Sequence, residues 1–141
     1  MVAFIAGAAA GLIYMLVFVA VAPVMVFSLA RHTESRTGAF VRRSNSTTLM
    51  LGLVVAAYPV WTLFGGMLGL LYRLSTQVAP GSGLGSGNLT YTLALALVTL
   101  LAVAPALVIL RHVALGVVVI AVAFVGIYGW LLPFLVNLAE R

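Results

Sequence analysis

Two Arg-His pairs are the residues of this sequence whose types and spacing could support chemistry. Arg31-His32 ends the first long apolar run, and Arg111-His112 ends the third. Two histidines on facing helices can ligate a haem iron, and neighbouring arginines can bind its propionates. Arg-His is also an ordinary anchor at the end of a membrane helix, because cations interact favourably with a helix C-terminus. Both histidines lie at the border of their runs, and this position favours the anchor over haem b binding.

A second group of candidate residues follows helical spacing inside the first two apolar runs. The second run places on one side Tyr58, Trp61, Thr62, Gly65 and Gly69. Tyr14 belongs to a similar stripe in the first run, together with Gly7 and Gly11. Polar aromatic groups at mid-membrane depth need partners, so these faces should look into protein. Gly-x-x-x-Gly spacing permits close helix approach, so we expect a helix interface here. The alternative is a pocket for a lipid, quinone or pigment between Tyr14, Tyr58 and Trp61.

The composition identifies the surroundings of the chain. Of its 141 residues, 65% are hydrophobic and only 6% are charged, whereas a soluble domain usually carries about 25% charged residues. The chain therefore requires lipid as its solvent. Its net charge of +5 comes from arginines that flank apolar runs, so it predicts membrane topology and no nucleic-acid partner. Cysteine is absent, which excludes disulfides, thiolate metal sites and thiol nucleophiles.

Four apolar runs reach the roughly 20 residues that a membrane-spanning helix needs. They are Val2–Ala30, Leu49–Tyr72, Tyr91–Leu110 and Val113–Val136. Lipid cannot satisfy the open edges of a sheet, and the runs do not alternate with period two, so each predicts a helix. We therefore expect an all-α integral membrane protein with one four-helix transmembrane domain, residues 1–141.

Each predicted helix contains one proline. Proline removes a backbone donor and clashes with the carbonyl one turn earlier, so Pro133 should free the carbonyl of Gly129. A freed carbonyl can contact an ion or a substrate. Proline is common in membrane helices, however, and the favoured interpretation is that these kinks shape helix packing.

The connections predict two helical hairpins and their orientation. A Gly/Ser-rich linker, 74–90, separates hairpin 1–73 from hairpin 91–141. Four of the seven arginines follow the first run and one follows the third. The positive-inside rule places both of these loops in the cytoplasm and both termini outside, N-out and C-out. All basic residues apart from histidine are arginines, and the chain is rich in Ala, Val and Gly. This composition is typical of prokaryotic genes, which indicates a bacterial inner (cytoplasmic) membrane.

The two halves share a sequence order that would fit a tandem repeat. Each contains Ala-Val-Ala-Pro, then Arg-His, then Leu-Gly-x-Val-Val. A duplicated hairpin would relate the halves by an axis along the membrane normal, and His32 and His112 would then lie at one depth. Apolar chains produce chance matches easily, so duplication and coincidence both stay open.

The acidic residues limit the functions that we expect. Glu34 and Glu140 are the only carboxylates, and both lie outside the apolar runs. No buried carboxylate is available for proton or cation coupling. No Ser-His-acid arrangement or carboxylate pair can form at membrane depth, and zinc would need more ligands than two histidines. We therefore expect no catalytic activity.

Three functions remain. The favoured one is a small non-catalytic subunit that packs, through its small-residue faces, against other membrane subunits in a respiratory or photosynthetic type of complex. The second is a self-associating channel or carrier for a neutral or hydrophobic solute, with the face from Tyr58 to Gly69 along the pathway. The third is a haem- or quinone-binding electron-transfer protein that uses His32 and His112.

Overall fold

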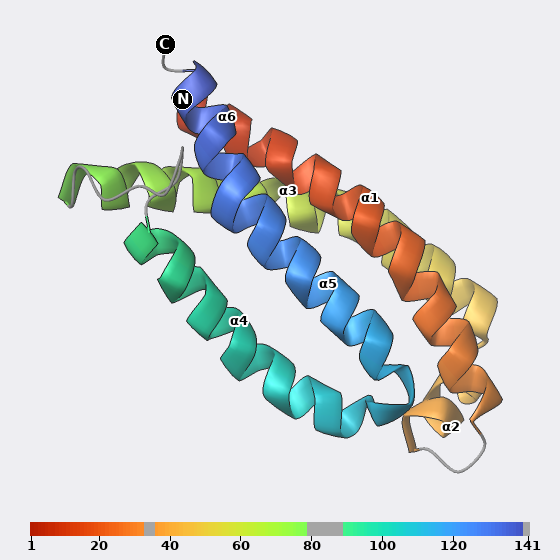
Figure 1. Ribbon diagram of the computed structural model, residues 1–141. Coiled ribbons are helices and arrows are strands. Elements are labelled where there is room, and N and C mark those ends of the chain that lie inside the picture. The colour runs from red at the N-terminus through yellow and green to blue at the C-terminus, as the bar shows by residue number, and fades with distance from the viewer. Residues whose placement is uncertain (33–35, 79–88, 140–141) are drawn as a thin grey trace.

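The computed structural model describes residues 1–32, 36–78 and 89–139. Within these ranges the chain is helical apart from short connections (Figure 1). The elements are α1 (Val2–Arg31), α2 (Arg36–Arg43), α3 (Ser46–Val78), α4 (Leu89–Ile109), the 3-10 turn η1 (Arg111–Val113), α5 (Ala114–Gly126), the π-helical turn η2 (Ile127–Leu131) and α6 (Leu132–Ala139). Four segments are long and apolar enough to cross a membrane: Val2–Arg31, Ser46–Ser75, Tyr91–Ile109 and Arg111–Ala139. The prediction of an all-helical protein with four such helices is confirmed.

Helix α1 is the centre of the arrangement. It packs along α3 on one side and against α5, η2 and α6 on the other, while α4 packs against α5 and η2. The N-terminus lies beside the end of α6, and α2 lies at the opposite end, next to the turn between α4 and α5 (Figure 1). We call this opposite end the arginine end, because residues Arg31, Arg36, Arg42, Arg43 and Arg111 belong to its segments.

A seam of glycines explains the close packing of α1 on α3. A Cβ added to Gly7 would collide with the Gly65 carbonyl oxygen, and it would come within 3.0 Å of the Gly69 Cα. A Cβ on Gly11 would collide in the same way with the carbonyl oxygen of Trp61. The two backbones are therefore in direct contact, and any larger side chain would force them apart. Close approach also allows weak Cα–H···O contacts between the helices.

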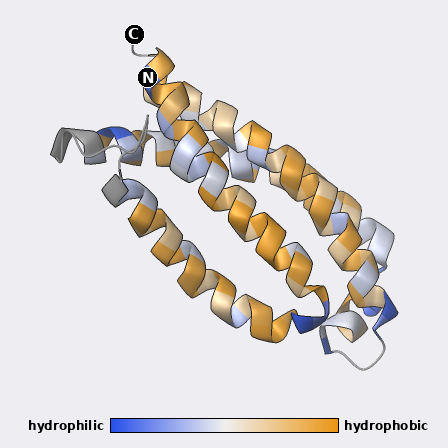
Figure 2. Cartoon of the chain, viewed as in Figure 1, coloured by the Kyte–Doolittle hydropathy of each residue, from blue (hydrophilic) through white to orange (hydrophobic). Residues whose placement is uncertain are grey.

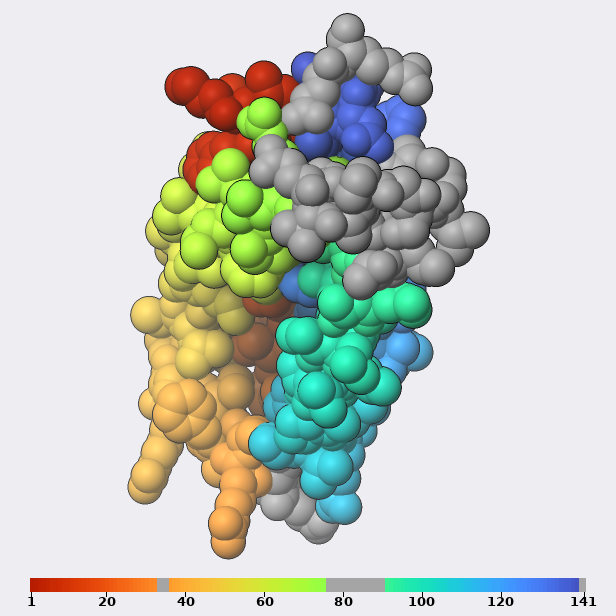
Figure 3. Space-filling model, turned by 90° about the vertical axis from the view of Figure 1, so that its left-hand side faces the viewer, coloured from red at the N-terminus to blue at the C-terminus, as the bar shows by residue number. Residues whose placement is uncertain are grey.

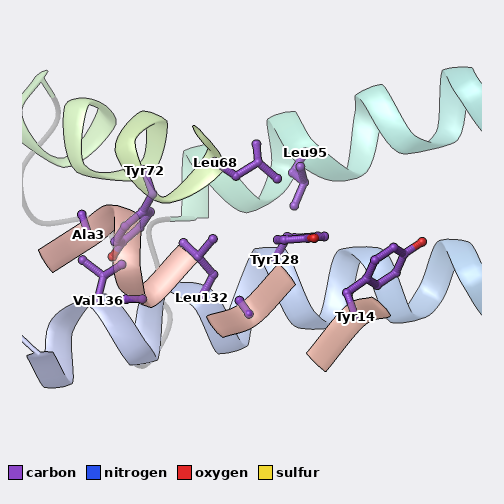
Figure 4. Close-up of a cluster of buried hydrophobic side chains, with 10 residues drawn as sticks. Ala3, Tyr14, Leu68, Tyr72, Leu95, Tyr128, Leu132 and Val136 are labelled. Atoms are coloured by element: carbon purple, nitrogen blue, oxygen red, sulfur yellow. The ribbon is translucent and has the colours of Figure 1, made fainter. Parts of the chain in front are cut away.

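The larger cluster of buried side chains joins α1, α3 and α4 to the fourth span (Figure 4). Tyr14 of α1, Tyr128 of η2 and Leu132 of α6 are each at most 1% exposed. Around them pack small residues of α1, including Ala3, and Val136 of α6. Small side chains on α1 face large ones on the fourth span, and this pairing fills the space between the helices.

Pro133 accounts for the π-helical turn that interrupts the fourth span. Proline cannot donate the N–H that the Gly129 carbonyl would accept in an α-helix, and its ring crowds that carbonyl. The helix widens here, and the N–H of Leu132 bonds the carbonyl of Ile127, five residues back. The hydroxyl of Thr92 in α4 donates to the Gly129 carbonyl at 2.9 Å. The carbonyl that Pro133 was predicted to free thus joins α4 to η2.

Two connections differ from the sequence prediction. The stretch between the first two spans was predicted as a loop, but it contains helix α2, whose Gly38 and Val41 are buried against the end of α1. Helix α3 then begins at Ser46, and the side chain of Asn45 caps it by accepting a hydrogen bond from the Thr47 N–H at 3.3 Å. Helices α3 and α4 also extend into the predicted linker, of which residues 79–88 lie outside the described chain.

Candidate functional site

An apolar groove opens on the side of the bundle between α3 and α4 (Figure 3). Its volume is about 500 Å³, within the range of binding sites for small molecules. α4 supplies one wall, from Val98 to Leu110, and α1 and α5 form the floor. Figure 3 shows α1 in dark red at the back of this hollow, behind α3 in yellow and α4 in green and cyan.

The groove exists because α4 follows α5 and does not pack along α3. The glycine seam draws α3 tightly onto α1, and α3 meets α4 near one end, where Tyr72 and Tyr91 have ring centroids 5.2 Å apart. Helix α4 has only small side chains on part of the wall that it supplies, at Ala102 and Ala106. The missing bulk leaves an open space that lipid or a ligand must fill, since an empty apolar space forfeits van der Waals contacts.

Aromatic rings close the groove on the side of the core. Tyr14 meets Trp61 edge to face with ring centroids 4.6 Å apart, and Phe124 lies 5.5 Å from Tyr14. Tyr14, Phe64 and Phe124 line the groove, whereas Trp61 supports Tyr14 from behind. Such edge-to-face contacts are the favoured geometry for aromatic pairs, so these rings form a packed end wall of the groove.

The lining offers almost no free hydrogen bonding. Its two hydroxyl groups belong to Tyr14 and Thr99. The Tyr14 hydroxyl donates to the carbonyl of Ile120 at 3.3 Å, and the Thr99 hydroxyl donates to the carbonyl of Leu95 in its own helix at 2.7 Å. Each hydroxyl has one hydrogen. A ligand in the groove therefore meets mostly hydrocarbon surfaces.

The predicted stripe on the second run divides into two parts in the structure. Trp61, Gly65 and Gly69 turn toward α1, and the Thr62 backbone lies against Gly11. Tyr58 lies elsewhere, with its side chain 58% exposed, so the expected pocket between Tyr14, Tyr58 and Trp61 does not form. The seam uses the neighbouring position, Ala57, which is buried, and Tyr58 is rotated away by one residue. The glycines of this stripe are thus enclosed between α1 and α3.

The two Arg-His pairs meet at the arginine end. The rings of His32 and His112 have centroids 4.6 Å apart and planes 33° apart. The Nδ1–H of His32 donates to the Ser28 carbonyl at 2.8 Å, and the Nε–H of Arg111 donates to Nε2 of His112 at 3.4 Å. All four side chains, including that of Arg31, are exposed. Figure 2 shows this polar corner in blue, beside the apolar spans.

This placement of the histidines does not fit haem. A bis-histidine haem holds its macrocycle between the two imidazoles. Each imidazole binds the iron end-on through one ring nitrogen, from opposite faces of the macrocycle, so the two rings cannot be in contact with each other. The centroids of His32 and His112 are 4.6 Å apart. Within the described chain, no group of three or more metal-ligating side chains surrounds this pair.

Sequence reasoning missed most of the groove. Its wall on α4, from Val98 to Leu110, consists largely of Ala, Val and Leu. These residues carry no chemical signal, and α4 has nearly the same apolarity all around. Only Thr99 and the small residues Ala102 and Ala106 distinguish this face. The position of α4 relative to α3, which decides whether a groove forms, is a tertiary property.

Comparisons with known proteins leave this architecture as the guide to function. No protein-family model, no curated protein and no solved structure matches this chain. Over the described residues, the fold and the site together define an all-helical protein with four helices long and apolar enough to cross a membrane, and with a lateral apolar groove that ends at a basic corner.

Proposed function

We propose that this is a non-catalytic membrane protein that holds the apolar chain of a membrane amphiphile in the groove between α3 and α4. The observation that carries the proposal is the groove itself, about 500 Å³ of apolar space open to the side of the bundle. A lateral opening of this kind admits a ligand directly from the bilayer, without passage through water.

The size of the groove supports a single hydrocarbon chain. A methylene group occupies about the volume of a water molecule, roughly 30 Å³. A space of about 500 Å³ therefore holds on the order of 15 methylenes, which is one acyl or isoprenoid chain. The aromatic end at Tyr14 and Phe124 would contact the end of that chain.

The scarcity of polar groups in the lining supports a chain over a quinone or pigment head group. A quinone carbonyl buried without a hydrogen bond loses its hydration at a cost in free energy. The hydroxyls of Tyr14 and Thr99 already donate to backbone carbonyls. The acidic residues, Glu34 and Glu140, lie outside the spans, which supports a binding role without catalysis.

Native mass spectrometry of the protein, purified in a mild detergent, tests this proposal. We expect one lipid to remain bound to each chain. Ala102→Trp fills the groove and should remove this lipid. Ala104→Trp makes the same change two residues along α4, at an exposed position outside the lining, and should retain the lipid. Equal lipid retention by the two variants would overturn the proposal.

The exposure of α4 supports a second candidate, a subunit of a larger membrane assembly. Only 6% of the most apolar stretch of α4 is buried, compared with 22% in α1. A helix of another subunit could cover α4 and fill the groove. The same mass spectra separate the candidates, because a stoichiometric protein partner in place of a lipid would favour the assembly.

For the surroundings of the chain, we propose a bacterial inner membrane, with both termini outside and the arginine end in the cytoplasm. Five of the seven arginines belong to this end, and cytoplasmic loops are enriched in Lys and Arg. The halves 1–73 and 91–141 would be two hairpins with the same orientation, as a tandem repeat requires.

A further inference from the structure

We infer that the Arg-His corner binds the anionic, phosphate-type headgroup of the same amphiphile whose chain occupies the groove. The protein would then select a lipid by its apolar chain and by its headgroup. The inference rests on the proposed function for the chain, and it adds the headgroup chemistry and the residues Arg31, His32, Arg111 and His112.

The groove leads directly to this corner. Leu110 lines the groove, and Arg111 and His112 follow it in the chain. On the other side, Met25 lines the groove and lies two helical turns before Arg31. A chain lying in the groove with its far end at Tyr14 therefore has its near end at the basic corner.

The corner is assembled from two distant segments of the chain. The contact between His32 and His112, with centroids 4.6 Å apart, joins the end of α1 to the turn before α5. A buried apolar cluster beneath it contains Val26, Leu29 and Val113. This cluster fixes the backbones from which the exposed Arg and His side chains extend, so the end of α1 and the turn before α5 stay side by side.

The charge at this end suits an anion. Five arginines belong to its segments. The stretch of sequence from the end of α1 to the start of α5 contains one carboxylate, that of Glu34. α2 adds Arg36, Arg42 and Arg43, and the Arg42 guanidinium donates to the Ala30 carbonyl at 3.4 Å, which holds α2 beside the end of α1. Like charges repel when no anion lies between them, so a phosphate would stabilise this arrangement.

The hydrogen bonds of the corner leave donors for a phosphate. The contact from Arg111 Nε to His112 Nε2 is long, at 3.4 Å, and a charge-assisted bond to a phosphate oxygen is shorter and stronger. Arg111 can therefore exchange one for the other. The other N–H groups of the Arg111 guanidinium can donate to the same phosphate, while His32 uses Nδ1 for the Ser28 carbonyl.

Lipid competition measured by native mass spectrometry tests the headgroup site. The purified protein is titrated with phosphatidylglycerol and with phosphatidylcholine of identical chains. We expect a preference for phosphatidylglycerol that falls about fivefold for each arginine removed, in Arg31→Gln and in Arg111→Gln. Arg111→Lys should recover part of the preference. Arg73→Gln removes the same charge at the opposite end of α3 and should leave the preference unchanged.

The outcomes separate this inference from the proposed function. If both lipids bind equally and Arg111→Gln changes nothing, the headgroup site is wrong while the groove proposal stands. If neither lipid binds, or if Ala102→Trp retains both, the groove proposal fails. Inorganic phosphate alone, titrated in a neutral detergent, should bind at least about tenfold more weakly than phosphatidylglycerol, because it gains nothing from chain burial. Equal affinity would exclude a role for the chain.

Discussion

The hydroxyl of Thr92 in α4 donates a hydrogen bond to the carbonyl of Gly129, at 2.9 Å, in the π-helical turn of the fourth span. This carbonyl has lost its ordinary helical partner because Pro133 has no N–H. The bond connects α4, the least buried span, to the best-packed part of the bundle. It therefore helps to hold α4 in place, and α4 forms one wall of the groove.

We predict that Thr92→Val lowers the free energy of unfolding by about 1 kcal/mol, because side-chain hydrogen bonds between membrane helices contribute about 0.6 and at most about 1.7 kcal/mol. The valine keeps the shape of the side chain and leaves the Gly129 carbonyl without this donor. The measurement is unfolding of the purified protein in mixed micelles of a mild detergent and SDS.

Two controls identify the interaction. Thr99→Val in the same helix removes a hydroxyl that bonds its own backbone, at Leu95, and should change stability less. Pro133→Ala restores an N–H near the Gly129 carbonyl, so the cost of Thr92→Val should shrink in that background. Additive effects of the two substitutions would show that the bond does not compensate for the proline.

The glycine seam makes a second prediction. Gly65→Ala places a methyl group against the Gly7 carbonyl and within 2.9 Å of the Gly11 Cα, and both of these are backbone atoms that cannot rotate aside. The helices must separate, and we expect a loss of about 1–3 kcal/mol, as for other overpacked sites. Gly52→Ala in the same helix meets nothing within 4 Å. It should be neutral or slightly stabilising, and equal melting temperatures of the two variants would refute the seam.

Sequence patterns predicted the four spans well, because length and apolarity alone decide whether a helix suits a bilayer. They did not predict α2, because it is only eight residues long and half of these are polar, and its Gly38 and Val41 pack against the end of α1. The spacing of glycines and aromatic residues predicted which helix faces meet. It assigned Tyr58 to the wrong side, since one residue of error on a helix is a rotation of about 100°.

The site was less predictable than the fold. The Arg-His pairs could be found because polar residues are rare in this chain, and their matching positions predicted one depth. Their contact depends on the turn after Leu110 reaching the end of α1, which no local pattern encodes. The groove depends on α4 diverging from α3, and the residues of its wall, such as Ala102 and Val103, look the same in sequence as residues that face lipid.

The third prediction compares Tyr14, which is buried in the core, with Tyr58, which is exposed on α3. Tyr14→Ala removes a ring that is 1% exposed and touches Trp61, Phe124 and Tyr128, and it should cost about 3 kcal/mol or more. Tyr58→Ala makes the same change where the ring is 58% exposed and should cost well under half as much. Tyr14→Phe keeps the ring and loses one long hydrogen bond, so its cost should stay below about 1 kcal/mol. A larger loss from Tyr58→Ala than from Tyr14→Ala would contradict this division of the stripe.

The orientation makes a fourth prediction, which the absence of cysteine from the chain makes simple to check. Thr47 is exposed at the start of α3, at the arginine end, and Val2 is exposed at the start of α1, at the other end. The arginine excess should hold the first of these ends in the cytoplasm. In intact bacterial spheroplasts, a membrane-impermeant maleimide should therefore label Val2→Cys at once and Thr47→Cys only after permeabilisation. The reverse pattern would show that the arginines do not set the topology, and it would place the headgroup site on the outer leaflet.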